Sequence, residues 1–172
     1  SAVAFAVEKL HDLTNDAGIL LRGASLGDRV WIDLNNNGIQ DVGEVGLNGV
    51  TVTLLNGSGG TDIDPITPGV QTLSTVTAFD AVIGDGYYQF TELVPGTYIV
   101  QVTLPTGYQF SPQDQGGNDT TDSDVNITIG RTAVITIGED DDDLTWDAGL
   151  VPLASIGDYV WRDNNNNGLQ DG

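Results

Sequence analysis

Short runs in which apolar and polar residues alternate recur along the middle of the chain. Residues 50–54 have the sequence Val-Thr-Val-Thr-Leu, so that alternate side chains would face a core and solvent. Further β-branched or aromatic runs lie at residues 30–32, 72–79, 87–90, 97–104, 125–129 and 132–137. Asn-Gly, Asp-Gly and Pro-Gly pairs separate several of them. With no amphipathic helix between the runs, the pattern predicts an all-β fold, an antiparallel β-sandwich, with residues 57–69 as a long exposed loop.

The chain contains an internal repeat. Residues 26–41 return with the same pattern at residues 156–171, a spacing of about 130 residues that fits tandem globular modules better than a solenoid. We therefore expect an N-terminal leader at residues 1–24 and a β-sandwich module at residues 25–152. Residues 153–172 would form a linker and the start of a second, incomplete copy.

The leader differs in character from the module. Val3, Val7, Leu10 and Leu13 have helical spacing, whereas residues 2–7 alternate as a strand would. Two roles remain open. The leader packs on its own module, or it is a strand lent to the open sheet edge of an identical subunit.

Charge and composition limit the partners. The 172 residues carry 25 acidic and 5 basic side chains, for a formal net charge of −20. Such a surface repels nucleic acid and anionic lipid and favours multivalent cations. The chain has no cysteine, which excludes zinc–thiolate and iron–sulfur sites, and no apolar run approaches the roughly 20 residues of a membrane span.

Residues 33–44 satisfy the calcium-loop pattern D-x-[DN]-x-[DN]-G-x5-E. Calcium takes six to eight oxygen ligands, so a binding loop must wrap around the ion, whereas magnesium demands stricter octahedral geometry. The pattern predicts a calcium site in which Gly38 permits the sharp turn. The ligands would be Asp33, Asn35, Asn37, the carbonyl of Ile39, Asp41 and Glu44. The alternative interpretation is a turn-rich loop that binds no metal. The recurrence of the same pattern from Asp163 makes this alternative weaker.

The second copy has the corresponding residues at the same offsets, with Leu in place of Ile39: Asp163, Asn165, Asn167, Leu169 and Asp171. It lacks a closing Glu within this chain, so we expect weak binding or none. A further acidic cluster includes Asp119, Asp122 and Asp124, and is either another calcium site or a solvated loop. The acidic run at residues 139–143 favours a solvated turn. Because strands rather than helices flank the 33–44 loop, calcium should stiffen the module and not act as a sensor switch.

Several of these motifs resemble one family. Gly-Asp-x-Val-Trp-x-Asp-x-Asn-x-Asn-Gly-x-Gln-Asp occurs in both copies, with Gly-Leu-Asn-Gly-Val-Thr-Val at 46–52, Gly-Tyr-Tyr-Gln-Phe at 86–90 and Leu-Val-Pro-Gly-Thr-Tyr at 93–98. Together they resemble the B domains of serine–aspartate repeat surface adhesins, in the collagen-adhesin B-type, transthyretin-like group. The resemblance implies a Greek-key sandwich, extracellular display, several calcium ions per module and a spacer role. Many collagen-adhesin B-type domains carry a Lys–Asn isopeptide crosslink, but the only lysine here is Lys9, outside the module.

Three classes of function follow. The leading interpretation is a calcium-stabilised structural module of an extracellular surface adhesin or filament, with adjacent tandem modules as partners. A binding module that recognises carbohydrate or protein through loops near Tyr108 and Phe110 is the alternative, although we expect these aromatic side chains to fill the core. An enzyme is disfavoured, because His11 is the only histidine and no nucleophile, phosphate-loop or zinc-ligand motif occurs.

Overall fold

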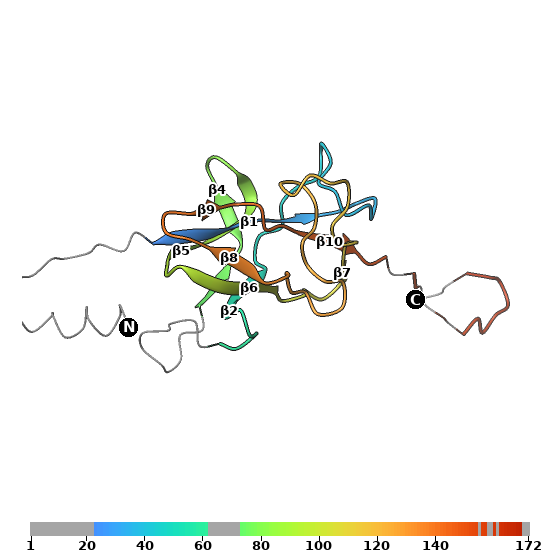
Figure 1. Cartoon of the computed structure of the whole chain (residues 1–172). Coiled ribbons are helices and arrows are strands. Elements are labelled where there is room, and N and C mark those ends of the chain that lie inside the picture. The colour runs from blue at the N-terminus through green and yellow to red at the C-terminus, as the bar shows by residue number, and fades with distance from the viewer. Residues whose placement is uncertain (1–22, 62–72, 155, 158–159, 161, 170–172) are drawn as a thin grey trace, which may run out of the picture.

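The computed structural model describes residues 23–61, 73–154, 156–157, 160 and 162–169. In this part of the chain the strands form two sheets packed face to face (Figure 1). The larger sheet has the order β4-β5-β1-β10-β7, with β9 also paired to β1, and the smaller has the order β3-β2-β6-β8. The strands are β1 (Ala24–Ile32), β2 (Thr51–Asn56), β3 (Leu73–Val76), β4 (Ala78–Asp80), β5 (Gly84–Leu93), β6 (Gly96–Val102), β7 (Tyr108–Phe110), β8 (Ile135–Ile137), β9 (Asp142–Asp143) and β10 (Ala148–Pro152).

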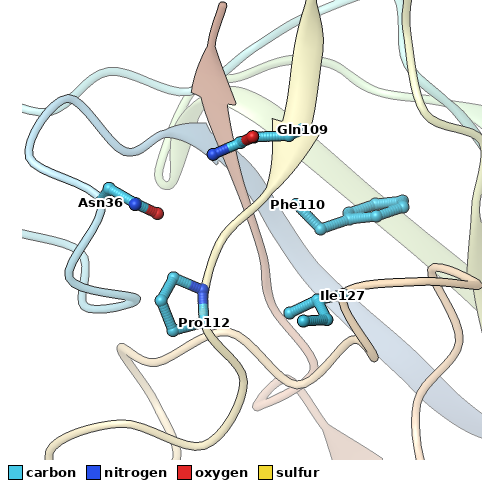
Figure 2. Close-up of a pocket in the computed structure, with 5 residues that line it drawn as sticks. All are labelled: Asn36, Gln109, Phe110, Pro112 and Ile127. Carbon is cyan, nitrogen blue, oxygen red and sulfur yellow. The ribbon is translucent and has the colours of Figure 1, made fainter.

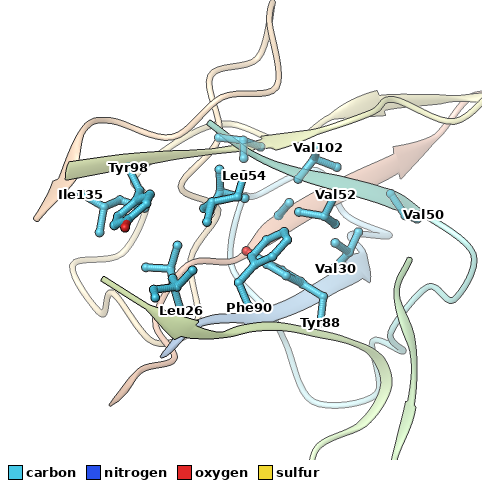
Figure 3. Close-up of a cluster of buried hydrophobic side chains, with 14 of the residues drawn as sticks. Leu26, Val30, Val50, Val52, Leu54, Tyr88, Phe90, Tyr98, Val102 and Ile135 are labelled. Carbon is cyan, nitrogen blue, oxygen red and sulfur yellow. The ribbon is translucent and has the colours of Figure 1, made fainter. Parts of the chain in front are cut away.

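The core lies between the two sheets and is built from alternate residues of their strands (Figure 3). Leu26 and Val30 of β1 face Val52 and Leu54 of β2, and all four side chains are completely buried. Burial of one face of each strand stabilises the sandwich by removing apolar surface from water. The predicted all-β sandwich is confirmed.

The chain passes repeatedly from one sheet to the other, from β1 to β2, from β5 to β6 and from β6 to β7, as expected for a Greek-key sandwich. Two pairings depart from the antiparallel expectation, and the first is the parallel pairing of β9 with β1 at Ser25 and Leu26. β10 runs parallel to β1, with Val30 opposite Ala148 and Ile32 opposite Leu150. Both strands therefore end at the same pole of the sandwich, which also carries the 33–44 loop.

The predicted strand at residues 72–79 is divided in two, and Thr72 lies outside the described residues. Thr77 separates β3 in the smaller sheet from β4 in the larger. Its buried hydroxyl donates to the Leu47 carbonyl at 2.6 Å and accepts from the Val50 amide at 2.9 Å. These bonds hold the chain where it crosses between the sheets.

The predicted strand at residues 125–129 is wrong, because this segment forms a turn. The Asn126 side-chain oxygen accepts the Thr128 amide at 2.9 Å, and the Gly130 amide donates to the Asn126 carbonyl at 2.8 Å. An Asn side chain that bonds the amide two residues on favours a turn over a strand. Ile127 and Ile129 are consequently exposed.

Some sequence-based predictions fall on residues that the structure does not describe. The leader lies almost entirely at residues 1–22, and the 57–69 loop is described only to residue 61. The two roles of the leader therefore stay predictions. Within the described residues, no helix is long and apolar enough to cross a membrane.

Candidate metal centre

The 33–44 loop leaves the end of β1 and is organised around Asp33. This residue is completely buried, and its amide donates to the Leu150 carbonyl of β10 at 3.0 Å. One carboxylate oxygen accepts the Asn36 amide at 2.6 Å and the other accepts the Gly38 amide at 2.9 Å. The carboxylate therefore folds the next five residues into a tight turn around itself.

Gly38 is required in this turn for two reasons. Its φ of 75° lies in the left-handed region, which side chains rarely adopt. A Cβ at this position would also lie 2.2 Å from the Pro112 carbonyl oxygen of a neighbouring loop. The predicted role of Gly38 in the sharp turn therefore has a geometric basis in both the backbone and its surroundings.

The other predicted side-chain ligands point into the same loop. The side-chain amides of Asn35 and Asn37 both donate to one Asp41 carboxylate oxygen, at 2.8 and 2.9 Å. Glu44 accepts the Leu34 amide at 2.8 Å through one oxygen, and the Trp31 indole and the Asp41 amide through the other, both at 3.1 Å. Glu44 thus returns to the start of the loop and closes it.

Ile39 lies where the 33–44 loop meets a second acidic loop. It forms an antiparallel bridge with Asp122, in which the Gln40 amide donates to the Thr121 carbonyl at 2.7 Å and the Ser123 amide to the Gly38 carbonyl at 3.0 Å. The carbonyl of Ile39 itself takes no part in these two bonds. The bridge joins two loops that are about 80 residues apart in the sequence into one acidic pole.

Asp119, Asp122 and Asp124 form a compact carboxylate cluster in the second loop. Each supplies an oxygen within 4.8 Å of the other two, and Asp122 and Asp124 are 5% and 4% exposed. One Asp122 oxygen is buried without a hydrogen-bond partner. Burial raises the pKa of Asp122, as do the charges of Asp119 and Asp114. Burial also raises the pKa of Asp124 to about 8, despite the opposing hydrogen bond from the Asp147 amide.

Asp147 extends this cluster, and sequence reasoning missed it. It precedes β10 and is only 3% exposed, and its amide donates to Asp124 at 2.5 Å. One of its own carboxylate oxygens accepts the Arg29 amide at 3.1 Å, whereas the other is buried without a partner. Burial, followed by the charges of Asp28 and Asp124, raises the pKa of Asp147 to about 9. The signal in the sequence was an acid placed directly before an apolar strand.

The second copy forms the same turn on its own. Asp163 accepts the Asn167 amide at 3.2 Å and the Gly168 amide at 2.8 Å, and Asn167 accepts the Leu169 amide at 2.8 Å. The backbone hydrogen bonds lower the pKa of Asp163, led by that from Gly168. The loop is exposed and lies beyond the sandwich in Figure 1, and Asp171 is outside the described residues.

The arrangement suits a hard divalent cation. Asp, Asn and Glu side chains with potential oxygen ligands come together in the first loop. In the second loop three carboxylates lie close together, and one oxygen of Asp122 there and one of the neighbouring Asp147 are buried without a partner. Buried carboxylates without a counter-charge are costly, so either a proton or a metal ion must offset them. In contrast, Phe110 belongs to the buried core and Tyr108 packs against it, as expected. That removes the aromatic feature on which carbohydrate recognition was based.

A family model for the SdrD B-like domain matches residues 24–150. The chain belongs to the SdrD B-like domain family. It is 40% identical over 151 residues to serine-aspartate repeat-containing protein F of Staphylococcus epidermidis, a match that covers 86% of this chain and 8% of that protein. It is 38% identical over 160 residues to serine-aspartate repeat-containing protein D of Staphylococcus aureus strain Newman, covering 92% and 11%. The chain thus spans about a tenth of the length of these relatives.

Proposed function

We propose that this SdrD B-like domain is a calcium-stabilised, non-catalytic spacer module of an extracellular surface adhesin. Its family and its resemblance to the B domains of serine–aspartate repeat surface adhesins support the spacer role and the location. The acidic pole supports the calcium requirement. Because the isopeptide crosslink of other collagen-adhesin B-type domains cannot form within the module, bound cations would supply its rigidity.

The observation that carries the calcium proposal is the carboxylate cluster at residues 119–124, in which Asp122 and Asp124 are buried and Asp119 is exposed. Oxygens of these three side chains lie within 4.8 Å of one another, and two like charges at that distance repel by about 3.5 kcal/mol at an effective dielectric constant of about 20. A divalent ion at this position would replace that repulsion with attraction to each carboxylate. It would also provide a partner for the unpaired oxygen of Asp122.

The 33–44 loop supports a second ion. The side chains that meet there belong to Asp, Asn and Glu, which carry the carboxylate and amide oxygens that calcium prefers as ligands. Its backbone turns are already formed around Asp33, so little ordering would be needed when an ion binds. Calcium fits better than magnesium because Asn side chains and carbonyl groups form an adaptable shell.

Thermal unfolding with calcium or with a chelator tests the proposal. An ion that binds only the folded state at 100 times its Kd adds about 2.7 kcal/mol of stability. For a domain of this size we expect Tm to rise by about 8 °C with calcium. The same Tm in both conditions would refute the calcium requirement while leaving the fold intact.

Asp33→Asn and Asp163→Asn form a matched pair for this experiment. Both replace the first acid of the loop motif, but Asp33 is buried in the module and Asp163 is exposed in the second copy. Asp33→Asn should reduce the calcium-dependent rise in Tm, and Asp163→Asn should leave it unchanged. Equal effects of the two substitutions would contradict the assignment of the site to the 33–44 loop.

A further inference from the structure

Four of the large apolar side chains exposed at the pole where β10 ends lie on the segments that follow β6, β7 and β10. Leu104 is 42% exposed, Ile127 59%, Ile129 57% and Leu153 54%. Leu104 and Leu153 flank the 105–107 turn, since the Leu153 amide donates to the Gly107 carbonyl at 2.8 Å. The turn that carries Ile127 and Ile129 is joined to the end of β6, because the Val102 amide donates to the Gly130 carbonyl at 2.8 Å. We call these four residues the exit face.

A recess adjoins the exit face (Figure 2). It has a volume of about 320 Å³ and is lined by Asn36, Gln109, Phe110, Pro112 and Ile127. Ile127 belongs to the exit face, and Asn36 belongs to the 33–44 loop. The recess therefore connects the exposed apolar surface to the candidate calcium site.

The repeat shows what comes next along the chain. Ala24 and Ser25, at the start of β1, recur as Ala154 and Ser155 with the same 130-residue offset as the rest of the repeat. β10 ends at Pro152, so a single residue, Leu153, separates it from the position where the next β1 would begin. Two consecutive virtual bonds of about 3.8 Å allow at most about 7 Å between the Cα atoms of Pro152 and Ala154. A following module cannot lie far from the exit face.

The structure also shows which end of that module would face it. β1 begins beside the β5–β6 connection, where Ala24 pairs with Leu93, and beside the acidic 139–142 turn, where the Ser25 amide donates to the Asp141 carbonyl at 2.8 Å. We call this end, residues 92–95 and 138–142, the entrance end. Val94 and Pro95 are half-buried, and Glu92 and residues 139–142 are exposed.

We propose that the exit face is the docking surface for the entrance end of the next module of the same chain. This inference rests on the proposed spacer function, and it adds that the spacer is stiff at its joints as well as within its modules. The two modules stack end to end, with Leu153 held in the interface by its bond to Gly107 and the 93–95 connection covering the apolar side chains. Both ends carry acidic residues, so the stack forms best when cations occupy the acidic pole.

The test uses a tandem protein in which residues 24–172 follow Leu153 of the chain. The chain has no cysteine, so Thr136→Cys in each copy gives a unique pair of spin-label sites on the exposed side of β8. The distribution of distances between the labels is measured at saturating calcium. A 12-residue Gly-Ser insertion after Leu153 gives the flexible reference, with a linker end-to-end spread of about 19 Å.

We expect a single narrow distance distribution for the tandem protein and a distribution at least twofold broader for the insertion. Ile127→Asp with Leu153→Asp should also broaden it, whereas Val134→Asp, at a position 54% exposed on the side of the module, should not. Tm of each variant in the single-module chain confirms folding. A tandem distribution as broad as that of the insertion would overturn the proposal.

The two measurements distinguish failure of this proposal from failure of the calcium proposal. If calcium does not stabilise the module, Tm is the same with chelator, yet the distance distribution of the tandem protein stays narrow. If the modules do not dock, Tm rises with calcium, yet the distribution is broad.

Discussion

Replacing Asp122 by Asn should raise stability without calcium and remove most of the stabilisation that calcium gives. The Asp122 carboxylate lies within 4.8 Å of Asp119 and Asp124, and one of its oxygens is buried without a partner. The neutral amide removes two like-charge contacts and can donate to the neighbouring carboxylates. Between two full charges 4.8 Å apart or closer, each contact would cost about 3.5 kcal/mol or more, but partial protonation lowers this cost, so we expect a gain of about 1–3 kcal/mol in chelator.

With calcium the same substitution removes a ligand. The variant should lose most of the about 2.7 kcal/mol that an ion at 100 times its Kd contributes. Differential scanning calorimetry at pH 8 measures both effects. At about 3 °C for each kcal/mol, Tm should rise by about 3–9 °C in chelator. The calcium-induced rise of about 8 °C should mostly disappear, so Tm in calcium should lie between about 5 °C below that of the unsubstituted protein and roughly equal to it.

Glu92→Gln is the matched control. It makes the same change of charge, but Glu92 is exposed at the other end of the module. Its effect should stay within about 0.5 kcal/mol in both conditions. If Asp122→Asn lowers Tm equally with calcium and with chelator, the cluster is not limited by charge repulsion and the reasoning is wrong.

Three further predictions address the turn, the buried acids and the leader. Gly38→Ala should lower Tm more than Gly43→Ala. Both glycines have a positive φ, but only at Gly38 would the added Cβ collide with a backbone atom, so equal losses of Tm would refute this reason. The raised pKa values of Asp124 and Asp147, about 8 and 9, mean that the folded state holds these protons more tightly than the unfolded state. The stability that these two bound protons contribute in chelator is therefore lost as pH rises from about 4 to 9. The calcium-induced rise in Tm should then grow between pH 5 and pH 9, and a rise that stays constant over this range would contradict the prediction. Deleting residues 1–22 should abolish self-association in light scattering if the leader exchanges between subunits, and a full chain that is monomeric would exclude that role.

The turn in the calcium-loop motif is determined by the sequence alone. Asp33 accepts the amides of Asn37 and Gly38 within the sandwich, and Asp163 accepts those of Asn167 and Gly168 in an exposed segment. These bonds span at most five residues, so local side chains and one glycine are enough to form them. The strands can likewise be predicted from the sequence, because the alternation of apolar and polar residues at 50–54 reflects a sheet with one buried face.

Prediction of strands from the local sequence pattern failed where a side chain forms hydrogen bonds that a continuous strand would not allow. Residues 125–129 alternate as a strand would, but Asn126 bonds the following amides and makes a turn. At Thr77 a run that looked continuous is divided between the two sheets, since the hydroxyl binds the chain at Leu47 and Val50. Neither partner could be identified from the residues within the run.

Only the tertiary structure decided which acids come together. Asp124 and Asp147 are 23 residues apart, and the Arg29 amide that Asp147 accepts is 118 residues away. Their proximity depends on the parallel pairing of β10 with β1, which the sequence does not specify. Burial then sets their pKa values, because the loss of water around a carboxylate is a property of the packed sheets and not of its neighbours along the chain.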